Sequence, residues 1–177
     1  MSENTNGILR GYGMENEIVL RNAREGDVKQ IAEICVEDWQ KAYRGIMDGE
    51  YLDSLSVDAR CEIERKRYQK FVVAARGDEI LGYAWPETGG DEDADCEIVA
   101  LYVRYGLRKN GIGKRLLACA MERFKALGKK KMILWCLKDN AEARAFYEKT
   151  GGKQGKTALH NWGGKDYAIV SYLYDLT

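Results

Sequence analysis

The chain has 177 residues, enough for one domain with a substantial core and few for two. Hydrophobic residues make up 45%, an ordinary share for a globular protein, and no apolar run approaches the length needed to span a membrane. The 28 basic and 28 acidic side chains balance, so no overall electric field favours nucleic acid, and the run Lys129–Lys131 is too short a basic patch to do so alone.

The N-terminal segment Met1–Gly13 contains little that could be buried. We therefore expect a flexible tail over residues 1–14 and a single domain over residues 15–177. The segment does not resemble a secretory signal, which predicts a cytoplasmic protein. The five cysteines are scattered and His160 is the one histidine, so we expect reduced thiols and no metal site.

The first third of the chain predicts one short strand and two helices. Ile18–Arg21 has the pattern of a strand, and apolar residues recur at helical spacing over residues 28–39. Asp27 stands where the N-cap of that helix belongs. Ser56 opens a second helix that we expect to reach about Tyr68.

Three strands are predicted next. Phe71–Ala75 and Ile80–Trp85 flank a hairpin signal, and Cys96–Val103 has the pattern of a buried strand. Pro86 has no backbone N–H to donate, so it should end the second of these strands or leave it at a sheet edge. Residues 87–95 predict a glycine-rich, acidic loop.

The rest of the chain alternates helices and strands. Ile112–Leu127 predicts a helix, Met132–Leu137 a buried strand, and Asn140–Thr150 a helix capped by its first residue. Lys153–Leu159 and Tyr167–Tyr174 predict a closing antiparallel pair. The strand–helix–strand unit in the middle implies two parallel strands with a right-handed crossover, so the whole order predicts one α/β domain with a mixed sheet.

The run Arg108–Gly113 joins a predicted strand to a predicted helix through a glycine-rich turn. Glycines let a backbone approach phosphate closely, and the free N–H groups of a helix's first turn attract anions. A Walker A loop is excluded, because Arg108 stands at the position of its first glycine and Arg115 follows Lys114. A dinucleotide fingerprint is excluded because Leu116 replaces its third glycine. The run therefore predicts a site for another phosphate compound.

The pattern R-x-x-G-x-G between a strand and a helix resembles the coenzyme A loop of the GNAT family of N-acetyltransferases. The stretch Asn140–Gly152 resembles the next helix of that family, with its Asn at the start and its Tyr near the end. Trp39–Ile46, followed by Tyr51 and Leu52, is similar to a segment of many small-molecule members. The resemblance covers the chain from about Ile18 onward.

The resemblance implies a single-domain acyl-CoA N-acyltransferase fold, with a mixed, mostly antiparallel sheet flanked by helices. It also implies that the parallel strands splay apart and that the pantetheine arm of acetyl-CoA lies between them. The residues that it assigns to acetyl-CoA, by their backbone or their side chains, are Leu101, Tyr102, Val103, Arg108, Lys109, Asn110, Gly111, Ile112, Gly113, Lys114 and Asn140.

Two residues match the family's catalytic positions. Tyr147 would protonate the coenzyme thiolate, since a phenol with a pKa of about 10 keeps its proton at neutral pH. The alternative is that Phe146 and Tyr147 only anchor their helix to the sheet. Glu97 would take a proton from the ammonium of the acceptor, directly or through water. Its alternative is a strand-edge carboxylate that only aids solubility.

Trp39 and Tyr43 lie one helical turn apart and could form an aromatic wall for the acceptor, where an ammonium group would gain cation–π attraction. The alternative for Trp39 is that it belongs to the core. The acidic run Asp91–Asp95 could attract cationic acceptors, but a solvated loop is the commoner role and the one that we favour.

These features predict an N-acetyltransferase that transfers the acetyl group from acetyl-CoA to a primary amine of a small molecule by direct attack in a ternary complex. The preference for a small molecule rests on the resemblance of the segment around Trp39 and Tyr43. Two alternatives stay open: a module that senses acyl-CoA without turnover, and an acetyltransferase of peptide or protein amines. The exposed edges of the closing strand pair could support a homodimer.

Overall fold

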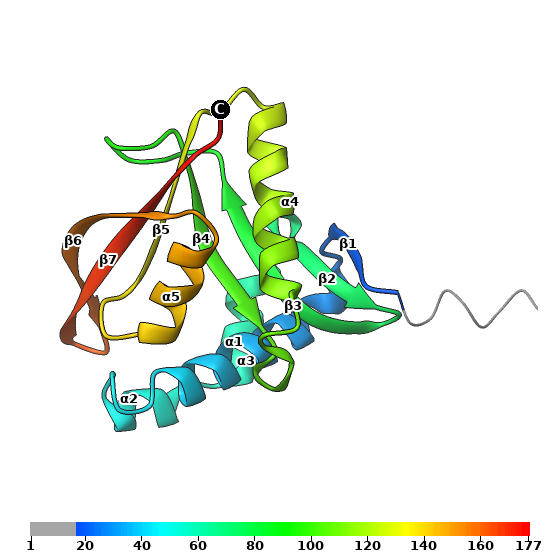
Figure 1. Cartoon of the computed structure of the whole chain (residues 1–177). Helices are drawn as coiled ribbons and strands as arrows, with labels where there is room; N and C mark the ends of the chain where they lie inside the picture. Colours follow the sequence, from blue (N-terminus) through cyan, green and yellow to red (C-terminus); the bar gives the residue numbers. More distant parts are fainter. Residues whose placement is uncertain (1–16) are drawn as a thin grey trace, which may run out of the picture.

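The computed structural model describes residues 17–177, and the predicted tail over residues 1–14 lies outside this range. Over the described residues the chain forms one mixed sheet in the order β1-β2-β3-β4-β5-β7-β6 (Figure 1). The strands are β1 (Val19–Asn22), β2 (Val72–Arg76), β3 (Glu79–Glu87), β4 (Cys96–Val103), β5 (Lys131–Leu137), β6 (Lys153–Trp162) and β7 (Lys165–Asp175). Only β4 and β5 pair in parallel, which confirms the predicted mixed, mostly antiparallel α/β sheet.

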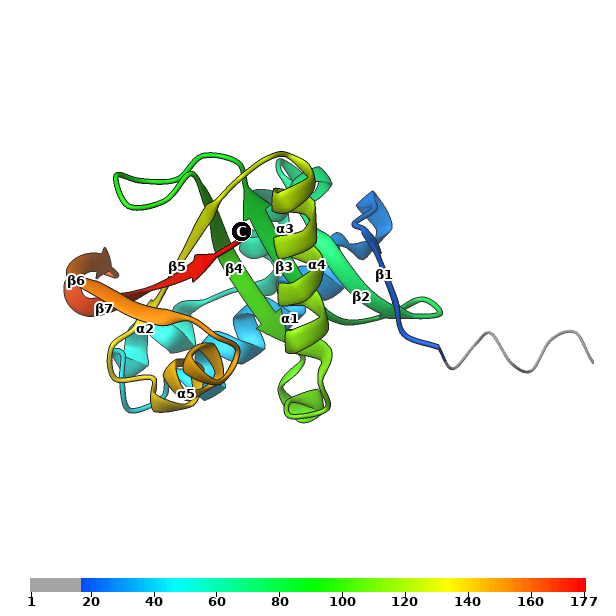
Figure 2. The same cartoon turned by 45° about the horizontal axis from the view of Figure 1, so that its top comes forward.

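Helices cover both faces of the sheet (Figures 1 and 2). The helices are α1 (Val28–Ala42), α2 (Gly49–Ser54), α3 (Val57–Arg65), α4 (Ile112–Ala126) and α5 (Ala141–Lys149). The apolar stripes of α4 and α5 pack on one face, and that of α1 packs on the other with α3 beside it. The helices α1, α4 and α5 therefore each bury one side against the sheet, as their apolar spacing requires, and α3 packs on α1. Within residues 17–177, no helix is long and apolar enough to cross a membrane.

The parallel strands β4 and β5 stay together for only part of their length. Their register pairs Cys96 with Met132 and ends at Ile98 with Leu134, although both strands continue for several residues. Beyond that point the β5-facing backbone groups of β4 have no ladder partner within residues 17–177, so they can bind a ligand. The splayed pair that the family resemblance implies is present.

The prediction for Pro86 is wrong. The strand β3 continues through Pro86 to Glu87 and lies between β2 and β4, not at an edge. The register with β4 shifts at this point, so Val99 is an extra residue that forms a bulge opposite Pro86. A bulge interrupts the ladder locally, which lets the sheet accept a residue without an N–H.

Three helical details also differ from the predictions. Asp27 precedes α1, but its carboxylate accepts hydrogen bonds from Arg21 and from the Arg24 backbone instead of capping that helix. The second helix ends at Arg65, because a short 3₁₀ turn (Tyr68–Lys70) follows. The helix α2 was not predicted; the Asp48 carboxylate caps it by accepting from Tyr51 N at 3.0 Å.

Candidate active site

A cavity of about 1100 Å³ lies where β4 and β5 separate, and the turn before α4 and the inner side of α5 complete its wall. Eleven residues that the sequence predicted for the site line it: Tyr43, Leu101, Tyr102, Val103, Arg108, Lys109, Gly111, Gly113, Lys114, Asn140 and Tyr147. Four others do not: Trp39, Glu97, Asn110 and Ile112. The fold thus brings the proposed phosphate turn and the proposed acid to one cavity.

The turn before α4 has the backbone of an anion cradle. Lys109 and Gly111 both have positive φ, at 66° and 81°, and Gly111 occupies the N-cap position without a side chain. The first intrahelical bond runs from Arg115 N to Gly111 O at 3.0 Å. The three preceding amides of α4 are helix-start N–H groups with no intrahelical acceptor, so the turn and the helix dipole both suit a phosphate. Ile112 turns its side chain into the core instead.

Arg108 does not extend freely into the cavity. Its guanidinium is paired with the Asp38 carboxylate and donates to Glu142 Oε2 at 2.9 Å. Lys109 also approaches Glu142, at 3.6 Å. Two carboxylates therefore line the predicted phosphate site, and they offset the positive charge of the turn.

Sequence reasoning missed both of these carboxylates, although Asp38 left a signal. It occupies a position on the apolar stripe of α1, one helical turn after Ile34 and Cys35, where a charge is unexpected. Only 4% of Asp38 is exposed. Burial raises its carboxyl pKa to about 6, although the neighbouring Arg108 guanidinium opposes the rise.

The strand β4 offers backbone groups to the same cavity. Every residue from Ile98 to Val103 lines it, and the bulge at Val99 lies beside the last residue that pairs with β5. Unpaired strand N–H groups are suitable donors to a carbonyl oxygen. That the end of this strand presents donors to a bound thioester stays a prediction.

Tyr147 projects from α5 into the cavity wall. Its ring packs edge-on against Phe146 at 5.4 Å and obliquely on Tyr172 at 5.6 Å. Burial raises the pKa of the Tyr147 hydroxyl well above its usual value, so the group is protonated at neutral pH. The hydroxyl forms no hydrogen bond with any residue in the described range, whereas the Tyr147 carbonyl accepts from Tyr174. The ring thus anchors α5, and the hydroxyl is available to a ligand.

Glu97 lies at the start of β4, one residue before the cavity wall. Its neighbours Cys96 and Ile98 point toward α4 and α5, so Glu97 points to the opposite face of the sheet. Burial, with Asp91 and Glu87 nearby, raises the pKa of the Glu97 carboxyl. A raised pKa suits a general base, but direct contact with a group inside the cavity is not built into this position.

Trp39 and Tyr43 do share one side of α1, with ring centroids 5.2 Å apart. Only Tyr43 faces the large cavity. The Trp39 indole donates to the Tyr102 hydroxyl at 2.8 Å and packs edge-on against Trp162 at 5.8 Å, where it lines a second, smaller pocket. The two rings therefore lie between the large cavity and the smaller pocket.

One lysine, Lys156, pairs with three carboxylates of the acidic loop after β3. The Lys156 ammonium lies 3.2 Å from Asp91, 3.0 Å from Glu92 and 2.8 Å from Asp93. The local carboxylates raise the pKa of Lys156, so it stays charged. This arrangement favours the interpretation of a structural, solvated loop over an attractor of cationic substrates.

Comparisons with known proteins agree with this geometry. The sequence matches the Acetyltransferase (GNAT) family over residues 29–152. The chain is 28% identical to the N-acetyltransferase YuaI of Bacillus subtilis (strain 168) over 135 residues, which cover 74% of this chain and 78% of that protein.

Two solved structures share the fold. The PaiA N-acetyltransferase of Thermoplasma acidophilum, in complex with coenzyme A, superposes with a TM-score of 0.66 at 23% identity, covering 89% of this chain and 99% of that one. YncA of Salmonella typhimurium, with acetyl-CoA, gives a TM-score of 0.67 at 18% identity, covering 92% and 95%. The chain belongs to the GNAT family, and its class of enzyme is the acetyltransferases.

Proposed function

We propose that this protein transfers the acetyl group of acetyl-CoA to a primary amine of a small molecule, by direct attack in a ternary complex. The observation that carries the proposal is the single cavity that joins the phosphate turn, the splayed end of β4 and Tyr147. An acetyl transfer needs these three features together: a hold on the nucleotide, donors at the thioester and a proton for the departing sulfur.

Acetyl-CoA would supply an activated acyl group as a thioester. The amides at the start of α4 would hold its pyrophosphate, with Lys114 adding positive charge. The unpaired amides of β4 would orient the thioester and stabilise negative charge on its oxygen. Asn140 uses its side-chain oxygen to cap α5 at 3.1 Å, which leaves its amide nitrogen to contact the coenzyme.

Tyr147 is our proposed acid. Its protonated hydroxyl lies in the cavity wall and can pass a proton to the leaving thiolate. Glu97 is our proposed base, acting through water because its side chain starts outside the wall. Its raised pKa increases its basicity toward an ammonium group.

The choice of a small-molecule acceptor rests on the segment around Trp39 and Tyr43. Tyr43, just after α1, lines the cavity, and the segment that follows it is tied to β7, where Asp48 N donates to the Tyr167 hydroxyl at 3.0 Å. A cavity wall fixed in this way suits a compact amine better than a protein surface.

The test is a calorimetric titration with acetyl-CoA, followed by a thiol-release screen against small amines and lysine-bearing peptides. Binding with release for a small amine supports the proposal. Binding of acetyl-CoA without thiol release for any acceptor would favour the sensing module. Thiol release with peptides alone would show that the acceptor is a peptide amine and not a small molecule. Failure to bind acetyl-CoA would refute the assignment of the cavity.

A further inference from the structure

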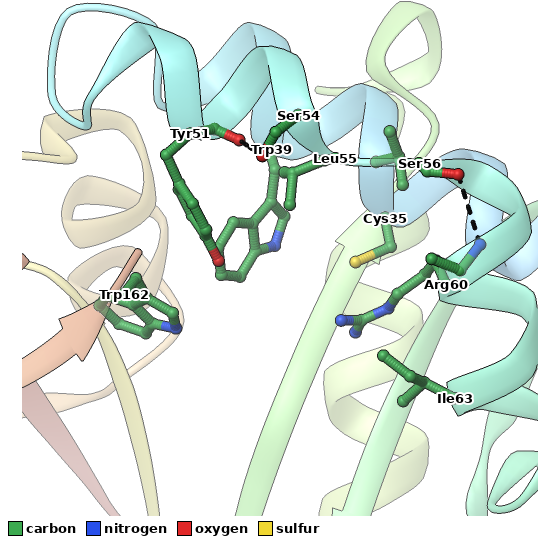
Figure 3. A pocket seen from close by; sticks show the side chains of 11 residues that line it. Cys35, Trp39, Tyr51, Ser54, Leu55, Ser56, Arg60, Ile63 and Trp162 are labelled. Atoms are coloured by element: carbon green, nitrogen blue, oxygen red, sulfur yellow. Dashed lines mark hydrogen bonds between the residues drawn. The ribbon is translucent and has the colours of Figure 1, made fainter. Parts of the chain in front are cut away.

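A second pocket, of about 330 Å³, lies on the other side of Trp39 from the large cavity. Helices α1, α2 and α3 form most of its wall, and Trp162 at the tip of β6 closes it. Figure 3 shows Trp39, Tyr51 and Trp162 grouped at one end and Arg60 with Cys35 at the other. Trp39 donates to the Tyr102 hydroxyl and Tyr102 lines the large cavity, so one layer of side chains separates the pocket from that cavity.

We propose that this pocket binds the carboxylate and the flat, apolar body of an acceptor amine, with the Arg60 guanidinium holding the carboxylate. This inference rests on the proposed function, since it names a feature of the acceptor. The pocket would then select amines that also carry an acid, such as aromatic amino acids or their longer analogues.

The pocket has a positively charged wall. Among the described residues that line it, Arg60 is the one with a charge, and none is a carboxylate. Glu64, which is fully buried, is the acidic neighbour, with its Oε1 2.5 Å from Arg60 Nε. The same carboxylate also accepts two hydrogen bonds from Arg67, at 2.7 and 3.0 Å. Two guanidinium groups thus share one carboxylate, which leaves a net positive charge beside the pocket.

The terminal nitrogens of Arg60 are available to a ligand. Its Nε faces the buried Glu64 carboxylate at 2.5 Å, so this nitrogen is taken up by the ion pair. Figure 3 shows the two terminal nitrogens directed into the pocket. The ion pair with Glu64 uses Nε, and the terminal nitrogens have no acceptor among residues 17–177, so the planar fork is available. A guanidinium fork binds a carboxylate with two parallel hydrogen bonds, and a half-buried setting strengthens them.

Close packing between the β6–β7 turn and α2 fixes the shape of the pocket. The β6–β7 turn packs so closely on α2 that a Cβ at Gly163 would lie 2.4 Å from Tyr51 Cδ2. Lys165 pairs with Asp48, which fixes the same turn to the start of α2. The aromatic end is therefore preorganised, and rigid aromatic walls favour a flat apolar group.

The pocket can be tested without any acetyl transfer. Indole-3-acetate has a flat body and a carboxylate, and indole-3-acetamide has the same shape without the charge. In calorimetric titrations of the protein with coenzyme A present, we expect the acid to bind at least 10-fold more tightly than the amide. Arg60→Gln should remove this difference, and Arg60→Lys should keep part of it, because it retains the charge without the fork.

Arg67→Gln is the matched control. Like Arg60→Gln, it removes one positive charge that pairs with Glu64. Arg67, however, stacks over Trp85 at 4.3 Å and does not line the pocket. The acid–amide difference should survive in this variant, and thermal melting would verify that all variants fold. Equal binding of acid and amide, no binding of either, or equal losses in Arg60→Gln and Arg67→Gln would each overturn the proposal. Acid binding through Arg60 without acetylation of any amine would refute the proposed function and leave the pocket standing.

Discussion

Replacing the buried Asp38 by asparagine should stabilise the protein at neutral pH. Asp38 lies in the wall of the cavity, 4% exposed, with Arg108 as its partner. Its carboxyl pKa rises from the ordinary 3.8 to about 6, chiefly because burial disfavours the charged form. The ionised carboxylate is therefore less stable in the folded protein than in the unfolded chain. Asparagine imitates the protonated form, and Arg108 keeps Glu142 as its partner in the variant.

The sign and the size of this change in the free energy of unfolding follow from proton linkage. The folded protein keeps the Asp38 proton to a higher pH than the unfolded chain, so this group stabilises the fold fully below about pH 4. That stabilisation is lost as the pH rises through about 6. The interval from 3.8 to about 6 corresponds to about 3 kcal/mol at pH 7. We expect the free energy of unfolding of Asp38→Asn, relative to the wild type, to increase by about that amount between pH 4 and pH 7.

Urea unfolding followed by tryptophan fluorescence at several pH values measures this difference directly. Taking the difference between variant and wild type removes the contributions of the other carboxylates, which titrate alike in both. Glu142→Gln is the control, since Glu142 is the exposed partner of the same arginine and its loss should change stability by at most about 1 kcal/mol. A difference that does not change with pH, or an Asp38→Asn variant less stable than the wild type at pH 7, would refute the reasoning.

Further predictions concern binding and turnover. Gly111→Asp should abolish calorimetric binding of acetyl-CoA by placing an anion at the cradle, whereas Gly111→Ala should mainly cost about 1–2 kcal/mol of stability at its φ of 81°. Tyr147→Phe should lower kcat at least 10-fold with the Kd of acetyl-CoA within about 2-fold; equal turnover would assign Tyr147 to packing alone. Glu97→Gln should lower kcat/KM at least 10-fold at pH 7, and an unchanged pH–rate profile would remove it as the base. Glu142→Gln should tighten acetyl-CoA binding about 3-fold at low salt, and the gain should vanish at high salt.

Several parts of the site could be predicted from the sequence because their signals are local. The strand Cys96–Val103, the start of α4 at Ile112 and the cap at Asn140 were all placed correctly. Hydrophobic period, glycines at a turn and capping side chains act within a few residues, so the linear chain contains them. The family resemblance added the splayed strands, which periodicity does not contain.

Contacts between distant segments were beyond the sequence. The pairing of Arg108 with Asp38 joins a turn to a helix 70 residues earlier in the chain. The bulge that admits Pro86 lies in the neighbouring strand, so no feature of β3 itself reveals it. The sequence did not indicate a role for Arg60, because an arginine on a short helix gives no local sign that it faces a pocket.

The sequence by itself determined the class of this protein, most of the order of its elements, the glycine turn before α4 and the tyrosine that follows on α5. Tertiary structure alone decided which charges meet. It set Asp38 and Glu142 against Arg108, placed Trp39 between the large cavity and the smaller pocket, and paired Arg60 with the buried Glu64 through Nε alone. The reason is physical: local propensity depends on neighbours along the chain, whereas burial and electrostatics depend on neighbours in space.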